Sequence, residues 1–163
     1  MSSTSLVVPI AFAAGWTVLL GLIGALATTL GPWYYALRKP SWQPPDWAFG
    51  PAWTTIFLCA ATAFVLAWRA PGSTPDDRTR LVQLWLLNAV LNVLWSVLFF
   101  RWRRPDWAVL EILPLWLSII AMAAAVASRR PSAAWLLAPY LLWVSFAAVL
   151  NATIVRLNGP FGR

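Results

Sequence analysis

Five long runs of apolar residues alternate along the chain with short segments rich in proline, glycine and charged residues. Each run is about 20–25 residues long, the length that an α-helix needs to cross the roughly 30 Å hydrocarbon core of a membrane. We therefore predict an all-α integral membrane protein in which residues 1–163 form a single five-helix domain. The predicted spans are Leu6–Leu30, Trp47–Trp68, Leu81–Phe100, Trp107–Ser128 and Ala133–Val155.

Composition and charge narrow the class further. Hydrophobic residues make up 61% of the chain and charged residues 10%, which excludes a soluble globular domain. The net charge of +7 comes from cations that lie almost wholly between the apolar runs, where they can contact lipid headgroups. A nucleic-acid surface needs its cations on one contiguous face, so we expect the lipid bilayer, and no nucleic acid, as a partner.

Histidine is absent, and the one cysteine, Cys59, lies inside an apolar run. These facts exclude Ser-His-Asp and Cys-His catalysis, histidine ligation of a metal or haem, and a disulfide within the chain. We interpret Cys59 as a small buried hydrophobic residue. We expect no metal site and no required cofactor.

The first connection, Gly31–Trp53, has an unusual composition. It holds four tryptophans, two tyrosines, one phenylalanine and five prolines. Because each proline fixes φ, removes a donor and restrains the preceding residue, we predict a stiff loop with no helix. So many rings would leave a large exposed apolar patch, so we expect them to be covered by the rest of the protein, a membrane interface or a ligand.

Turn-forming and small residues lead to three further expectations. The segment Arg69–Arg80 is rich in turn formers and charges and is predicted to be an ordinary loop. Gly21, Ala25 and Thr29 recur every four residues, which predicts a face that another helix can approach closely. Pro114 lies inside the fourth span, where we expect a kink.

Two spans carry polar or small residues every four positions, which places each set on one face of its helix. Amides are costly in lipid, so both faces should point into the bundle. The sets either hold the bundle together by interhelical hydrogen bonds or form the walls of a cavity, and the two interpretations are compatible. The sets are Asn88, Asn92 and Ser96 in the third span and Trp143, Ala147 and Asn151 in the fifth.

Glu111 is the one acidic residue deep in a predicted span. Carboxylates inside membranes are costly and often functional. Because Glu111 is near the end of its span, a structural explanation is also open: it can reach the interface or pair with Arg101, Arg103 or Arg104. No second carboxylate lies in the membrane to complete an acid–base pair.

Three sequence patterns together resemble a known family. They are W-Y-x-x-L-x-K-P-x-W-x-P-P-x-W-x-x-G-P-x-W from Trp33 to Trp53, L-N-x-x-W-x-x-x-F-F from Leu91 to Phe100, and P-Y-L-x-W-x-x-F-A-x-x-L-N from Pro139 to Asn151. The chain is similar over nearly its whole length to the TspO/translocator protein family. That family is also known as tryptophan-rich sensory protein or peripheral-type benzodiazepine receptor.

The resemblance implies a five-helix bundle, often a homodimer, whose first loop caps a pocket for porphyrins such as protoporphyrin IX or haem. It also implies that Trp53 and Trp143 are the candidates for any catalytic role. The ligand-binding residues that it implies are Trp33, Lys39, Trp42, Trp47, Phe49, Trp53, Asn88, Asn92, Trp95, Trp107, Trp143, Ala147 and Leu150.

Two features adjust what the resemblance implies. Lys39 and Arg38 are placed to meet the carboxylates of a porphyrin. Animal members carry a sterol-recognition stretch with a central tyrosine at the end of the fifth helix, but here Val149–Arg156 has Ala152 at that place. This departure argues against sterol binding.

The function that we predict is a membrane receptor or sensor for porphyrins, linked to tetrapyrrole homeostasis or stress regulation. A porphyrin transporter is one alternative. The five spans do not divide into two repeats of inverted topology, which many alternating-access transporters have, and this counts against it. The other alternative is light-dependent porphyrin degradation, through indole redox chemistry, and we rank binding above catalysis. We expect the protein in a bacterial cell membrane or outer membrane.

Overall fold

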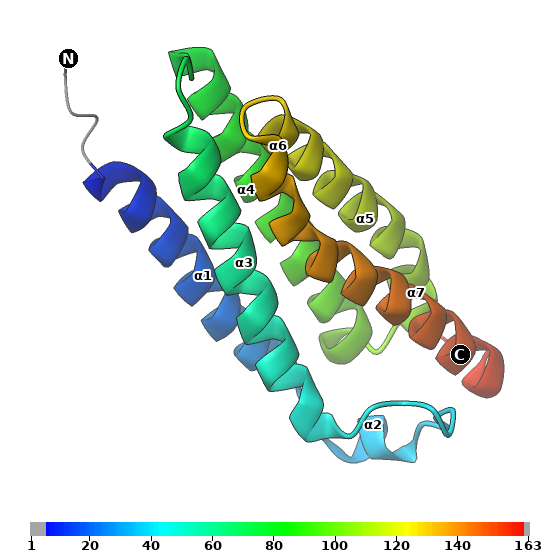
Figure 1. Cartoon of the computed structure of the whole chain (residues 1–163). Helices are drawn as coiled ribbons and strands as arrows, with labels where there is room; N and C mark the ends of the chain where they lie inside the picture. The colour runs from blue at the N-terminus through cyan, green and yellow to red at the C-terminus, as the bar shows by residue number, and fades with distance from the viewer. Residues whose placement is uncertain (1–5, 162–163) are drawn as a thin grey trace.

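The computed structural model describes residues 6–161, and within them all regular secondary structure is helical (Figure 1). Five helical segments are long and apolar enough to span a membrane, as predicted. Three of them join several helices end to end: η1 precedes α3, the π-helical η2 follows α4, and α6 and η3 precede α7. The helices are α1 (Val7–Ala27), α2 (Pro32–Ala36), η1 (Asp46–Ala48), α3 (Phe49–Trp68), α4 (Pro75–Ser96), η2 (Val97–Arg101), α5 (Pro105–Ala127), α6 (Pro131–Ala134), η3 (Trp135–Leu137) and α7 (Ala138–Asn158).

Proline marks the start of five of the seven α-helices in the described part of the chain. It occupies one of the first two positions of α2, α4, α5, α6 and α7. There its missing N–H costs nothing and its fixed φ already suits a helix. By contrast, Pro114 lies well inside α5, which continues through it without a break.

The spans pack side by side in a closed order (Figure 1). α1 contacts α3 and α4, α4 contacts α5, and α5 contacts α7. The bundle closes between α3 and the last span, where α3 contacts α6 and η3 and touches α7 only sparsely. The seam between α3 and α7 is therefore the loosest one.

Aromatic rings pack between α1 and α3. Phe12 stacks on Phe64 with ring centres 4.7 Å apart, and Trp16 contacts Phe57 at 5.5 Å. Ala60, Ala63 and Ala67 on α3 are fully buried in the same core. The Trp16 indole donates a hydrogen bond of 2.9 Å to the Trp85 carbonyl, which joins α1 to α4. The predicted close face at Gly21, Ala25 and Thr29 is wrong within this chain, because all three are exposed on the outside of the bundle.

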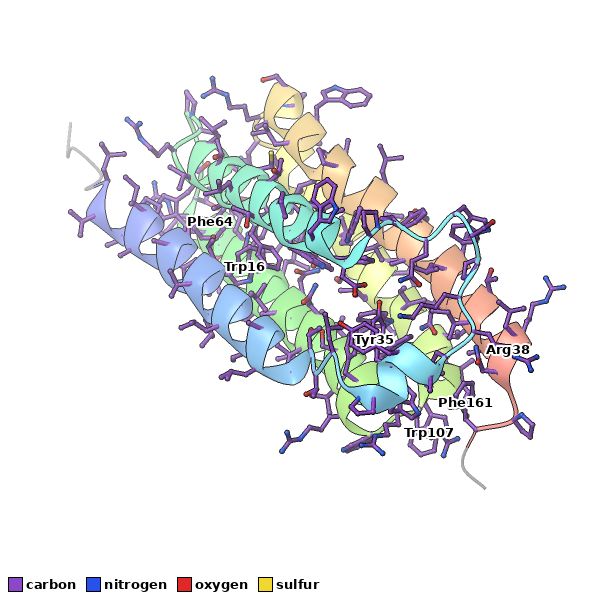
Figure 2. All side chains as sticks on the ribbon, turned by 90° about the horizontal axis from the view of Figure 1, so that it is seen from below. Trp16, Tyr35, Arg38, Phe64, Trp107 and Phe161 are labelled. Atoms are coloured by element: carbon purple, nitrogen blue, oxygen red, sulfur yellow. The ribbon has the colours of Figure 1, made fainter. Side chains whose placement is uncertain are left out.

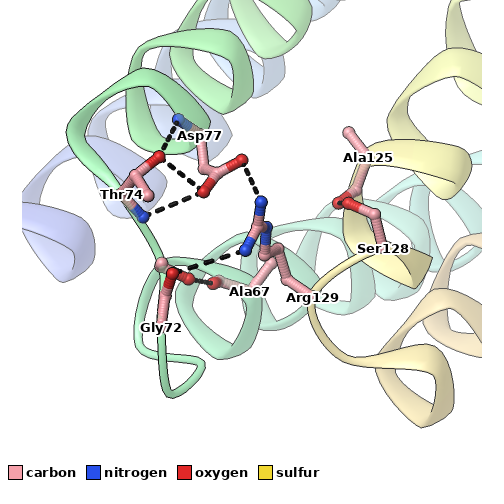
Figure 3. Close-up of polar contacts among 8 residues, drawn as sticks. Ala67, Gly72, Thr74, Asp77, Ala125, Ser128 and Arg129 are labelled. Carbon is pink, nitrogen blue, oxygen red and sulfur yellow. Dashed lines mark hydrogen bonds and ion pairs between the residues drawn. The ribbon is translucent and has the colours of Figure 1, made fainter.

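The prediction of a loop over Arg69–Arg80 is correct only for its first half. α4 begins at Pro75, because Thr74 and Asp77 form a capping box that satisfies its first N–H groups. Asp77 also accepts a hydrogen bond of 2.6 Å from Arg129, which ties this turn to the turn between α5 and α6 (Figure 3). Charged residues here start a helix instead of extending a loop.

The prediction that Gly31–Trp53 contains no helix is also wrong in part. Residues Pro32–Ala36 form the short helix α2, because Pro32 is at a helix start and the next proline, Pro40, lies beyond its end. Further on, η1 and the first turn of α3 occupy residues 46–53. Within this segment only Gly31 and residues 37–45 are irregular, and the irregular stretch 37–45 contains Pro40, Pro44 and Pro45.

Candidate functional site

The first loop, residues 28–48, crosses the end of the bundle at which α5 begins and α7 ends. Figure 2 shows the molecule from below, with Tyr35 and Arg38 labelled at this end of the bundle. Asn158 in the last turn of α7 accepts a hydrogen bond from the Arg38 N–H at 2.7 Å and donates one to the Arg38 carbonyl at 2.8 Å. Two bonds from one side chain therefore fasten the loop to α7.

Asn158 was not predicted as a functional residue, because the predicted last span ended at Val155, three residues before it. A polar residue four positions after Ile154, continuing the buried face of α7, is the signal that could have found it. Its amide also bonds the Ile154 carbonyl at 2.8 Å, so the side chain is held in place by its own helix.

Replacing Asn158 with alanine is expected to loosen the loop without unfolding the bundle. The change removes both bonds to Arg38, and limited proteolysis within residues 37–45 should become roughly 5–30-fold faster, in line with about 1–2 kcal/mol of lost local stability. Thr153→Ala is the matched control, because Thr153 is partly exposed on the same helix and bonds only the Val149 carbonyl. Equal cleavage rates in wild type and Asn158→Ala would contradict the role of this clamp.

Tyr34 organises the inner side of the loop. Its hydroxyl donates to Asp46 and accepts from Gln43, both at 3.1 Å. Burial, with the Asp46 carboxylate second, raises the pKa of Tyr34 to about 12, so the hydroxyl stays protonated and remains a donor. The Lys39 ammonium lies 3.5 Å from the centre of the Tyr34 ring, and partial burial lowers the pKa of Lys39.

Aromatic rings from the loop, α3 and α7 meet at Trp143. The centre of its ring lies 5.5 Å from that of Phe49, 6.4 Å from that of Trp53 and 5.7 Å from that of Phe146. The Trp42 ring, from the middle of the loop, contacts Phe146 at 5.7 Å. These edge-to-face and tilted contacts join three separate segments into one aromatic wall.

An open groove of about 530 Å³ reaches this wall from the side of the bundle, along the loose seam between α3 and α7. Its volume is within the range of small-molecule sites. Of the thirteen residues predicted to bind ligand, Trp143 lines this groove and the other twelve do not. The lining residues are Pro51, Ala52, Thr55, Ile56, Pro139, Leu142, Trp143 and Phe146.

A second group of rings lies directly beneath the loop. The Trp33 ring contacts Phe99 at 6.1 Å, and Trp95 stacks on the same Phe99 ring at 5.3 Å. Leu150 belongs to the same buried cluster, and Ala147 is half-buried against the neighbouring main core. The loop therefore lies on apolar side chains, as its composition predicted.

Two predicted residues are not brought into this site. Trp47 is 76% exposed on the outer side of the loop, and Trp107 is 49% exposed at the start of α5. The Trp107 ring is covered instead by the Arg104 guanidinium at 4.6 Å and contacts Trp102 at 6.5 Å. Tryptophan is common at the interface between membrane and water, so both indoles are explained by their exposed positions at one end of the bundle, without a ligand.

The polar face of α4 forms a hydrogen-bonded network in the bundle core. The Tyr140 hydroxyl donates a hydrogen bond to the side-chain oxygen of Asn88 at 3.0 Å and accepts one from the side-chain amide of Asn92 at 2.9 Å. The Asn88 amide donates to Ser118 at 2.9 Å. Asn88 and Asn92 therefore form hydrogen bonds between helices, which is the first of the two interpretations. That they also contact a ligand stays a prediction.

Asn151 is buried on α7 and joins it to the start of α5. With its amide oriented to satisfy both neighbours, it donates to the Pro105 carbonyl at 3.1 Å and accepts from the Val109 N–H at 3.2 Å. Trp143 and Asn151 therefore contact different partners: Trp143 belongs to the aromatic wall, and Asn151 to the contact between helices.

Glu111 is buried, and the expected pairing with arginines is wrong. Within residues 6–161 neither of its carboxyl oxygens has a hydrogen-bond partner. Arg104, the nearest arginine along the chain, pairs instead with Asp106, and this bond holds the pKa of Arg104 above its ordinary value. Among the described residues no group of three or more histidine, cysteine or acidic side chains is arranged to hold a metal.

Five apolar helical spans and a fastened aromatic loop define a multi-pass integral membrane protein with a lidded bundle. Residues 8–157 match the model of the TspO/MBR family, and the chain belongs to that family. It is 37% identical over 154 residues to the tryptophan-rich protein TspO of Chlorobaculum tepidum, covering 93% of this chain and 97% of the relative. It is 34% identical over 151 residues to the translocator protein of Sus scrofa (90% and 89%) and 33% identical over 140 residues to the protein CrtK of Rhodobacter capsulatus (85% and 85%).

Proposed function

We propose that the protein is a membrane receptor or sensor that binds porphyrins, such as protoporphyrin IX or haem, in a pocket under the first loop. The observation that carries this proposal is the meeting of Phe49, Trp53 and Phe146 around Trp143, at the inner end of an apolar groove. Binding there links the protein to tetrapyrrole homeostasis or stress regulation.

The chemistry of a porphyrin supports the assignment. A porphyrin is a flat apolar disc with carboxylate arms, and indole faces stack on such a disc for about 0.5–1.5 kcal/mol per pair beyond burial. Lys39, held over the Tyr34 ring at the loop, supplies a cation for the carboxylates. Since the chain has no histidine, we expect metal-free porphyrin to bind about as well as haem.

The test is quenching of tryptophan fluorescence by protoporphyrin IX in detergent. Trp143→Phe and Trp53→Phe are each expected to raise the dissociation constant roughly 3–10-fold, because each loses an indole face. Trp135→Phe is the matched control, because Trp135 is 79% exposed on η3, at the end opposite the first loop (Figure 1). Quenching that does not saturate and is identical in all four proteins means that the porphyrin only partitions into micelles.

The contact between Trp53 and Trp143 favours light-dependent porphyrin degradation as the second candidate function. Two indoles with ring centres 6.4 Å apart are close enough to exchange an electron. Repeating the titration under illumination separates the candidates. Loss of porphyrin absorbance in wild type but not in Trp143→Phe supports catalysis, and absorbance that only shifts supports binding alone.

We further propose a bacterial cell membrane or outer membrane as the location, which is consistent with the likeness to TspO of Chlorobaculum tepidum and CrtK of Rhodobacter capsulatus. Fractionation of the two membranes after expression in the source cell distinguishes these alternatives.

A further inference from the structure

Glu111 is the one carboxylate among the buried polar residues of the described chain, with 8% of its surface exposed. It lies on the buried face of α5, between Ala108 one turn before and Leu115 one turn after. At 1.5 Å per residue, it is about 9 Å from the start of the helix. This depth places it beneath the first loop and inside the membrane span.

Of the six polar residues buried in the described bundle, Glu111 is the one whose side chain makes no hydrogen bond. Single buried atoms of Thr17, Gln43, Trp68, Arg78, Trp85 and Arg129 also lack a partner, but Glu111 is the one carboxyl group in this set. Asn88, Asn92 and Ser118 bond within the Tyr140 network, Ser96 bonds a backbone carbonyl, and Asn151 bonds the start of α5. Both oxygens of Glu111 are inaccessible and have no hydrogen-bond partner in the same region. A buried carboxyl without a partner costs stability, so its presence needs a reason outside the packing.

The position of Glu111 supplies that reason, because it lies where two apolar clusters meet. Ala108 belongs to the cluster under the loop, and Leu115 belongs to the main core. On α7, Leu150 and Ala147 divide between the same two clusters, and Trp95 on α4 contacts both. Glu111 is therefore at the level where the predicted ligand-binding residues Trp95, Ala147 and Leu150 lie.

We propose that Glu111 is a ligand-contacting residue of this site, and that it selects apolar ring compounds that carry an N–H donor at their edge, such as an amine. The inference rests on the proposed function and specifies its ligand. The site is polarised, with the cation Lys39 at the loop and an acidic group beneath it. A ligand that carries carboxylates at one edge and an amine at the other binds with its carboxylates toward the loop and its amine toward Glu111.

The stability of the ligand-free protein provides the first test. If Glu111 serves a ligand, Glu111→Leu removes an unsatisfied carboxyl and should raise the unfolding temperature by roughly 2–5 °C. Glu111→Gln keeps the shape of the side chain but cannot ionise, and it serves as a second variant in case Glu111→Leu does not fold. A lower unfolding temperature in both variants would mean that the carboxyl stabilises the bundle, through an ordered water for example, and would overturn the proposal.

Ligand selectivity provides the second test, with two fluorescent probes of nearly equal shape. Wild type should bind 9-(aminomethyl)anthracene about tenfold or more tightly than 9-methylanthracene, the value of one hydrogen bond to a charged group. The preference should disappear in Glu111→Leu and shrink in Glu111→Gln. Asp106→Asn, on the same helix, is the control for general attraction of the amine, because its carboxylate pairs with Arg104 and should not affect the preference.

The outcomes separate this inference from the proposed function. Saturable quenching by protoporphyrin IX without any preference for the amine overturns the role of Glu111 and leaves porphyrin binding intact. A preference for the amine that depends on Glu111, without saturable porphyrin binding, supports the role of Glu111 and overturns the porphyrin assignment. An equal loss of preference in Asp106→Asn and Glu111→Leu also contradicts the inference.

Discussion

Phe64→Ala is expected to lower the free energy of unfolding by about 3–5 kcal/mol, the largest effect of any single change considered for this protein. Phe64 on α3 is fully buried. Its ring stacks on Phe12 of α1 at 4.7 Å and contacts Trp85 of α4 at 5.3 Å and Trp68 at 5.5 Å. Truncation leaves a cavity where three helices meet. Because lipid supplies little hydrophobic drive between helices, these packing contacts hold the bundle together.

Unfolding by sodium dodecyl sulfate in mixed micelles, followed by tryptophan fluorescence and circular dichroism, measures this loss. Leu58→Ala is the matched control, because Leu58 lies on the same helix and is 57% exposed on the outside. It should change the free energy of unfolding by less than about 1 kcal/mol, since lipid replaces the lost contacts. Equal losses in the two variants would contradict the assignment of Phe64 to the core.

Tyr140→Phe is expected to cost about 1–3 kcal/mol, the second largest effect. The change removes one hydroxyl and leaves both the side-chain oxygen of Asn88 and the side-chain amide of Asn92 without this partner. Hydrogen bonds between helices in membranes are individually modest, but here one deletion leaves two buried amides less satisfied. The same unfolding assay measures the cost.

Tyr35→Phe controls for the loss of a tyrosine hydroxyl at an exposed position and should be within about 0.5 kcal/mol of wild type. The double variant Tyr140→Phe with Asn92→Leu provides a cycle. If the two residues act through their shared bond, the double variant should cost less than the sum of the single ones. Strict additivity would mean that the bond contributes nothing to stability.

The sequence was sufficient to predict the five spans and most of their starts. Spans are predictable because an apolar run of membrane length has no other stable conformation in lipid. The start of the fourth span was predicted at Trp107, two residues after the observed start at Pro105, and a proline at that place is typical of the first turn of a helix. The start at Pro75 was missed, because the charges of a capping box and those of a loop look alike without the contact to Arg129.

The candidate site was predicted less completely than the fold. Phe49, Trp53 and Trp143 followed from family resemblance, whereas Phe146, which contacts Trp143, was not predicted. Only the three-dimensional arrangement separates these rings from Trp47, which is exposed. The missing partner of Glu111 had no signal at all in the sequence, since three arginines close by in the chain were available to pair with it. Nor could the sequence predict a bond between residues 120 positions apart, as in the clamp of Arg38 by Asn158.

The hydrogen bonds between Arg38 and Asn158 also determine when, during synthesis, the first loop can be fastened to the bundle. Residues 28–48 leave the ribosome early, but the side chain that fastens them is in the last turn of α7. Trp143 and Phe146, against which Phe49 and Trp42 pack, are also made late. Throughout the insertion of the middle spans, the aromatic loop has neither its wall nor its fastening. The aromatic wall and the fastening of the loop are therefore completed only when synthesis of the last span ends, and a chain that stalls before α7 has neither.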